Sequence, residues 1–193
     1  GGAAVEGRAV QGMRSLTYLQ PGERRGCVGC HEPSGTTVPV ERTLASVREP
    51  SRIEPGPDGS MPWSYPRLVQ PILDQHCVAC HGEGGNAPDL RGAPMGTFTI
   101  SYESLKPYTR WYEWGDSTIS VIATKPGEMP ADVSPLAKIW DAPQHKDIIQ
   151  LSDEEKRRVY LWLDGNASFY GAYSHAEQVA LRQGEAIPPP ALQ

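Results

Sequence analysis

The chain has 193 residues and a formal net charge of −5 at pH 7, from 18 Lys and Arg against 23 Asp and Glu. This balance gives no electrostatic reason to expect nucleic acid or an anionic membrane as a partner, and no apolar run approaches the roughly 18 residues of a transmembrane helix. Leu, Ile, Val and Phe make up less than a fifth of the chain while Gly and Pro number 20 and 19, so the core needs a disulfide, a metal or a large cofactor.

The first third of the chain is poor in predicted regular structure. Residues 1–20 contain one short amphipathic stretch, which Pro21 and Gly22 end, and its apolar positions are Val10, Met13, Leu16 and Leu19. Residues 32–62 contain six prolines and several glycines, so we expect loops there.

The rest of the chain predicts short helices separated by long loops. Apolar residues at helical spacing predict a helix from about Pro66 into Cys77, residues 82–98 return to a loop rich in Gly and Pro, and short helices are expected at 101–107 and 134–141. Ser152 and Glu155 form a capping box, which predicts that the best-defined helix begins at Ser152 and ends near Gly165. A last short helix is expected at 174–183. The predicted fold class is therefore mainly α with extensive loops.

The four cysteines form two copies of the pattern C-x-x-C-H, which are Cys27, Cys30 and His31, and Cys77, Cys80 and His81. Two thiols at this spacing reach the two vinyl groups of a porphyrin, and the adjacent His binds the iron, so the pattern is the attachment signature of a c-type haem. Two disulfides or one tetrahedral zinc site would also use four cysteines, but neither explains the His in both copies.

The sequence therefore predicts two covalently bound haem c groups and a small c-type cytochrome fold organised around them. We expect a di-haem domain over residues 1–173, with a first haem lobe at about 1–62 and a second at about 63–173, followed by a C-terminal extension at 174–193. Because c-type haem is attached outside the cytoplasm, the protein is expected to be exported, either to the periplasm or to the outside of the cell.

The second axial ligand of each iron is the main open question, with His31 and His81 as the first ligands. His145 precedes the capped helix and is far enough along the chain to fold back over the second haem; the alternative is a solvated loop histidine. Met129, which precedes Pro130 as in the methionine loop of single-haem cytochromes c, is the rival.

For the first haem we expect His76. This residue directly precedes Cys77, cannot easily reach over the haem of its own motif, and can point away to the other one; otherwise it is a surface histidine at a helix end. His175, near the C-terminus, is free or reaches a neighbouring subunit, and Met13 is either a ligand of the first haem or a packing residue.

Three blocks of sequence, taken in their order along the chain, carry a resemblance to a known family. The first runs from Met13 to Glu32, the second from Tyr65 to His81, and the third comprises Ser134–Leu136, His145, Leu151–Ser152, Trp162–Asp164 and Phe169–Gly171. Over most of residues 8–173 they resemble the C-terminal cytochrome region of planctomycete proteins similar to the hydrazine synthase alpha subunit. The resemblance implies that the His before the capped helix is the distal ligand of the second haem, which favours His145 over Met129. It implies a haem module rather than hydrazine synthesis, which needs further domains and subunits.

These observations predict an electron-transfer protein rather than an enzyme, because two irons with both axial positions filled cannot bind a substrate. A more specific hypothesis is a polymerising conduit, a filament or other homo-oligomer with haem-to-haem contact in which His175 or the tail touches the next subunit. The alternative is a subunit of a redox enzyme with one open iron that acts on a small nitrogen or oxygen compound. The expected partners are redox proteins.

Overall fold

The computed structural model describes residues 7–10, 18–23, 35–37, 47–50, 52, 56, 59, 61–111, 126–185 and 187–188. The chain divides into two compact units, one of Gly1–Met13 with Pro55–Gln193 and one of Arg14–Glu54. We call the first of these the main unit, and every helix and strand named below belongs to it. Met13 and the first motif, with Cys27, Cys30 and His31, lie outside the described residues. The predicted boundaries of the two haem lobes stay a prediction.

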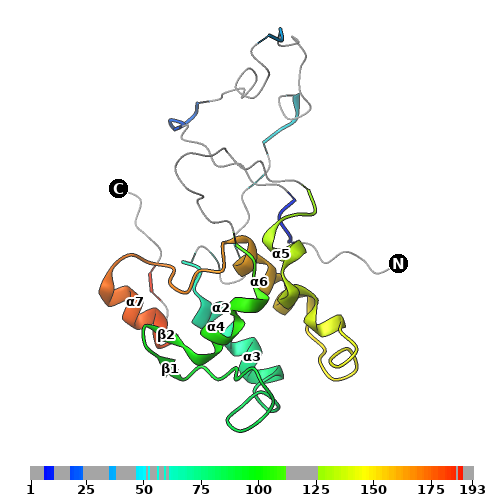
Figure 1. The fold of residues 1–193 in the computed structure, drawn as a ribbon. Coiled ribbons are helices and arrows are strands. Elements are labelled where there is room, and N and C mark those ends of the chain that lie inside the picture. Colours follow the sequence, from blue (N-terminus) through cyan, green and yellow to red (C-terminus); the bar gives the residue numbers. More distant parts are fainter. Residues whose placement is uncertain are drawn as a thin grey trace. The chain divides into compact units, whose positions relative to one another are not determined.

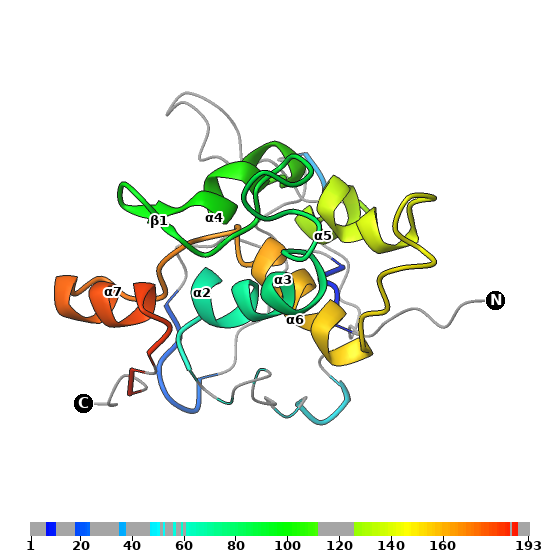
Figure 2. The same cartoon turned by 90° about the horizontal axis from the view of Figure 1, so that it is seen from below.

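The main unit is mainly α with long connections, as predicted (Figures 1 and 2). In chain order its elements are α2 (Tyr65–Leu68), α3 (Gln70–His76), β1 (Pro94–Met95), β2 (Phe98–Thr99), α4 (Ile100–Leu105), the 3₁₀ helix η1 (Lys106–Tyr108), α5 (Pro130–Val133), the 3₁₀ helix η2 (Pro135–Asp141), α6 (Asp153–Asp164) and α7 (His175–Arg182). In the described part of the chain, every helix is too short or too polar to cross a lipid bilayer.

The helix predicted from Pro66 into Cys77 is present but divided at Val69 into α2 and α3. The division has a local cause, because Pro71 has no N–H to donate to the carbonyl group of Arg67 four residues earlier. The helix predicted at 101–107 is divided in a similar way into α4 and η1, with Pro107 inside η1. The helix predicted at 134–141 is the 3₁₀ helix η2.

One other expectation needs correction. Residues 82–98, predicted as a loop throughout, contain most of the antiparallel pair β1 and β2, in which Pro94 pairs with Thr99 and Met95 with Phe98. The amphipathic stretch expected within residues 1–20 lies mostly outside the described residues. Val10 and Leu19, which are described, are exposed.

The core is built on α6, which packs against α2, α5 and η2. Large rings replace the missing aliphatic side chains. Tyr65 and Trp162 are fully buried, and they join a group of touching aromatic rings, completed by Phe98, Tyr102 and Phe169. Each such ring buries more area than an aliphatic side chain, which explains how so small an aliphatic content supports a core.

The start of α6 confirms the predicted capping box. Ser152 Oγ accepts a hydrogen bond from the backbone N–H of Glu155 at 3.2 Å, and the Glu155 carboxylate accepts one from the backbone N–H of Ser152 at 2.7 Å. The same carboxylate lies 2.8 Å from His76 Nε2. The capping box therefore ties the end of α3 to the start of α6.

Residues 7–10 and helix α7 both pack against the other elements of the main unit. The backbone N–H of Ala9 donates to Asp164 at 2.7 Å, and Arg8 pairs with Asp132 at 3.3 Å. At the other end of the chain, α7 packs against α2, buries Leu181, and donates from Arg182 to the Gly96 carbonyl oxygen at 2.7 Å. The described part of the predicted extension is thus a packed element.

Replacing Ser152 with Ala tests the capping box. The change removes the acceptor for one N–H of the first turn of α6, so we expect the free energy of unfolding to fall by about 1 kcal/mol in a urea titration of the haem-loaded protein. Ser168→Ala, an exposed serine whose side chain makes no hydrogen bond among the described residues, should change it by less than about 0.5 kcal/mol. Equal losses in the two variants would contradict the assignment.

Candidate functional site

The second C-x-x-C-H motif begins where α3 ends. Cys77 caps α3 by donating its N–H to the Leu73 carbonyl oxygen at 2.8 Å, and the N–H groups of Cys80 and His81 both donate to the Cys77 carbonyl oxygen, at 3.1 and 2.9 Å. The motif is therefore one tight turn that continues the helix. The Cys77 and Cys80 thiols are free, Cys77 half-buried and Cys80 exposed, so this pair does not form a disulfide.

The loop after the motif folds back onto it. Asn86 N–H donates to the Cys80 carbonyl oxygen and Leu90 N–H to that of His81, both at 2.8 Å. A side chain at Gly85 would place its Cβ 2.5 Å from the Cys80 carbonyl oxygen, so only glycine allows this close return. The motif thus needs the glycine-rich run that follows it.

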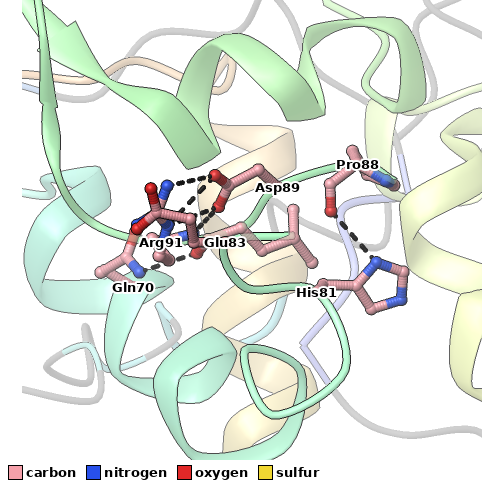
Figure 3. Close-up of polar contacts among 7 residues, drawn as sticks. Gln70, His81, Glu83, Pro88, Asp89 and Arg91 are labelled. Carbon is pink, nitrogen blue, oxygen red and sulfur yellow. Dashed lines mark hydrogen bonds and ion pairs between the residues drawn. The ribbon is translucent and has the colours of Figure 1, made fainter. Parts of the chain in front are cut away.

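The returning loop fixes the ring of His81. His81 Nδ1 lies 3.1 Å from the Pro88 carbonyl oxygen (Figure 3). Because a carbonyl oxygen only accepts, Nδ1 carries the proton, and Nε2 keeps the lone pair that binds a metal. A metal-binding histidine commonly donates its other N–H to such an acceptor.

His145 lies next to the ring of His81. The centroids of the His81 and His145 rings are 6.1 Å apart, with an angle of 37° between their planes. Two imidazoles that bind one metal ion from opposite sides, at about 2 Å each, have centroids roughly 6 Å apart. His145 Nδ1 is also buried with no hydrogen-bond partner among the described residues. These two side chains therefore fit an iron held between them.

A backbone turn holds His145 in this place. Its N–H donates to the Ala142 carbonyl oxygen at 2.8 Å, and its own carbonyl oxygen accepts from Ile149 N–H at 2.7 Å. This turn connects η2 to the residues that precede α6. The position of His145 is therefore set by the packing of η2 and α6 rather than by residues near the motif.

The environment of Cys77 disfavours its thiolate form. Burial, and to a smaller extent the nearby Cys80 thiol, raises the pKa of Cys77 to about 11. Zinc prefers the deprotonated thiolate. A zinc site made of both motifs would also include Cys27 and Cys30, which lie outside the described residues.

The other predicted ligands lie in different settings. His76 Nε2 is paired with Glu155, and His175 is exposed at the start of α7. Met129 is buried and forms the N-cap of α5, and its carbonyl oxygen accepts from Asp132 N–H at 2.7 Å. The structure thus brings together His81 and His145 among these candidates.

The Glu155 carboxylate beside His76 is held in its ionised form. Burial favours the protonated form, but hydrogen bonds from Ser152 and His76 outweigh it and lower the pKa of Glu155 below its usual value. An ionised carboxylate can only accept, so His76 Nε2 donates to it. Ligation of a metal through Nε2 of His76 would require this contact to break.

Two residues of the site escaped the sequence analysis. Pro88 acts through its carbonyl group, which every residue has, so no pattern could single it out. Gln70 is buried with the apolar face of α3, and the sequence could have indicated it. It is a polar residue at a position that helical spacing assigns to the core.

Two family models match the chain. Residues 4–32 match the hydrazine synthase alpha subunit middle domain, and residues 66–163 match cytochrome C oxidase, cbb3-type, subunit III. No curated protein and no solved structure shows a significant similarity to the chain. The first match includes the first C-x-x-C-H motif and ends at residue 32. We expected a resemblance to the C-terminal cytochrome region of such proteins over most of residues 8–173. The match is instead to the middle domain, and it covers only residues 4–32.

The second match spans half of the chain and contains α3, the second motif, His145 and α6 up to Leu163. Its range thus encloses the pair of facing histidines and the helices that position them. The chain therefore belongs to the family of cytochrome C oxidase, cbb3-type, subunit III, and has its small helical c-type cytochrome fold with covalently bound haem c.

Proposed function

We propose that this protein transfers electrons through two covalently attached haem c groups, one at each C-x-x-C-H motif. Haem-based electron transfer follows from membership of the cytochrome family. What supports the closed, fully ligated form of the second site is the 6.1 Å separation of the His81 and His145 rings. An iron bound by two imidazoles has no free position for a substrate, so it exchanges electrons only.

In this proposal the second motif supplies both the anchor and the first ligand. Cys77 and Cys80 would carry the thioether bonds, His81 would bind the iron through Nε2, and His145 would be its second protein ligand. The haem supplies the one-electron couple of its iron. The Pro88 carbonyl group makes His81 a more basic ligand by accepting its Nδ1–H, which stabilises the ferric state. Two histidines also give a lower potential than a histidine with a methionine.

The first motif is proposed to carry the second haem on Cys27 and Cys30, with His31 as its first ligand. The match of residues 4–32 to a hydrazine synthase alpha domain includes this motif and is compatible with that assignment. The distal ligand of this haem stays a prediction, with His76 first and His175 and Met13 as alternatives. Export to the periplasm or beyond, and transfer to redox partner proteins, belong to the same proposal, because c-type haem is attached outside the cytoplasm.

The number of haems is tested by intact mass after expression with a haem-attachment system. We expect the wild-type chain to carry two haems and the Cys77→Ala/Cys80→Ala variant to carry one, since each motif binds independently through its own thioether bonds. The Cys27→Ala/Cys30→Ala variant is the matched control and should also retain one. A wild-type mass with one haem would limit the proposal to one motif.

The distal ligand of the second haem is tested by visible spectroscopy of three variants. We expect His145→Ala to convert about half of the total haem to a high-spin form that binds carbon monoxide when reduced, because one of two irons loses an axial ligand. Met129→Leu, which conserves volume, and His175→Ala should remain low-spin. A low-spin His145→Ala variant with a high-spin Met129→Leu variant would assign the ligand to Met129.

The same spectra decide between the electron carrier and the enzyme with an open iron. The wild-type protein should be fully low-spin and should not bind carbon monoxide. A high-spin band in the oxidised wild-type protein would instead favour the redox enzyme that acts on a small nitrogen or oxygen compound.

A polymerising conduit is the more specific form of the proposal. Its support is the outer face of α7, where His175 and Val179 are one turn apart and exposed, with Tyr173 exposed just before them. Exposed apolar side chains beside a potential haem ligand suit a contact with a second copy of the chain.

Light scattering at rising protein concentration tests this form. We expect the apparent mass to rise above that of one 21.1 kDa chain with its haems, and we expect His175→Ala to reduce the rise. Gln183→Ala, an exposed change at the end of the same helix, is the control and should leave association intact. A single monomeric species at every concentration would contradict the conduit and leave electron transfer standing.

A further inference from the structure

We infer that Gln70 is a positioning residue for the His81 ligand. By holding the Leu90 carbonyl group, its amide fixes the loop whose Pro88 carbonyl oxygen accepts the His81 Nδ1–H. The inference rests on the proposed haem site at the second motif, and it adds to that site a side chain that touches neither the iron nor its ligands.

The amide of Gln70 has a single orientation. Its Nε2 donates to the Leu90 carbonyl oxygen at 3.1 Å and to Asp74 Oδ1 at 2.8 Å, and its Oε1 accepts from Ser101 Oγ at 2.5 Å. Both N–H donors are thus used, and the oxygen is used as well. Because Gln70 is only 8% exposed, water could not replace a hydrogen bond that its amide lost, and the loss would cost free energy. The buried amide is therefore locked.

The hydrogen bond from Gln70 to the Leu90 carbonyl group completes a small network of hydrogen bonds around His81. Leu90 N–H donates to the His81 carbonyl oxygen at 2.8 Å, and Pro88, two residues earlier, accepts from the His81 ring. The Leu90 side chain is buried as well. Fixing Leu90 on α3 therefore limits how far the Pro88 carbonyl group can move relative to the His81 ring. Figure 3 shows Gln70, Pro88 and His81 together.

Other contacts hold the loop elsewhere but do not replace this one. Backbone bonds from Ser101 and Ile100 of α4 hold the carbonyl oxygens of Arg91 and Ala93, beyond Leu90. Arg91 pairs with the partly buried Asp89 at 2.8 Å and with the exposed Glu83 at 2.5 Å. Both ion pairs join residues of the loop to one another, so they stiffen the loop without tying it to α3. Gln70 supplies the tie between this part of the loop and the helix that carries the motif.

Gly92 leaves the space that the Gln70 amide occupies. A Cβ at this position would lie 3.0 Å from Gln70 Cδ and 3.2 Å from its Nε2. A methyl group there would make the Gln70 side chain shift by a few tenths of an ångström without removing any hydrogen-bonding group. Gly92→Ala therefore disturbs the position of the same amide without changing Gln70 itself.

The consequence for the iron follows from the strength of the His81 hydrogen bond. A firmly placed carbonyl acceptor makes the imidazole more basic and so stabilises the ferric state, and loosening it raises the reduction potential. Gln70→Met keeps the length of the side chain but loses the donor to Leu90. We expect the preference of one haem for the ferric state to fall roughly threefold, an upward shift of about 28 mV at 59 mV per factor of ten.

The experiment is a potentiometric titration of the full haem-loaded chain, with electron paramagnetic resonance of the oxidised protein. Gln70→Met and Gly92→Ala should both raise one potential and alter the low-spin signal of one haem. Ser101→Ala is the matched control. It removes the hydroxyl group that donates to the oxygen of the same amide but leaves the donor to the Leu90 carbonyl group in place, so it should lower stability with a clearly smaller shift of the potential.

Two outcomes overturn the inference. If Gln70→Met and Ser101→Ala lower the free energy of unfolding equally and leave both potentials and the resonance signal unchanged, Gln70 is a packing residue only. If Gln70→Met does not fold, an unchanged potential in Gly92→Ala has the same meaning. Failure of the proposed function itself is seen separately, as a wild-type chain whose Cys77 and Cys80 carry no haem by intact mass.

Discussion

The hydrogen bond between the His81 ring and the Pro88 carbonyl oxygen is the contact on which the site depends. It decides which ring nitrogen can bind a metal, and it requires the chain to turn back within seven residues of the motif. That return brings the backbone so close to Cys80 that Gly85 cannot carry a side chain. It also leaves the Leu90 carbonyl group facing α3, where Gln70 receives it. One acceptor thus accounts for the glycines, the buried amide and the orientation of the ligand.

The aromatic core serves the same site. Cys77 and Val78 pack against the cluster that contains Tyr65 and Trp162, so the helix end that carries the motif is held by the residues that hold the fold. Burial raises the pKa of Tyr65, which therefore stays neutral in this cluster. A chain with few aliphatic residues thus has two other sources of buried apolar surface, which are its own aromatic rings and the haem group that its family binds. A low aliphatic content is therefore compatible with a core that a covalently bound haem c completes.

Structural features that depend on neighbouring residues could be predicted from the sequence, whereas contacts between residues far apart in the chain could not. The start of α6 followed from Ser152 and Glu155 because a capping box acts within four residues. The break at Val69 was missed because the apolar spacing continues through it while Pro71 interrupts the hydrogen bonds. Strands of two residues, as in β1 and β2, have no periodicity to detect. His145 was a candidate through ligand chemistry and family resemblance, but its place opposite His81 depends on how η2 and α6 pack. Nothing in the sequence marks a backbone acceptor such as that of Pro88.

The contact between His76 and Glu155 makes the ligand prediction for His76 more specific. Because the ionised carboxylate only accepts, Nε2 carries the proton, and a neutral His76 ring keeps its lone pair on Nδ1. This is the arrangement of His81 with the two nitrogens exchanged. A ligand role of His76 through Nδ1 is therefore compatible with the contact to Glu155, whereas a role through Nε2 is not.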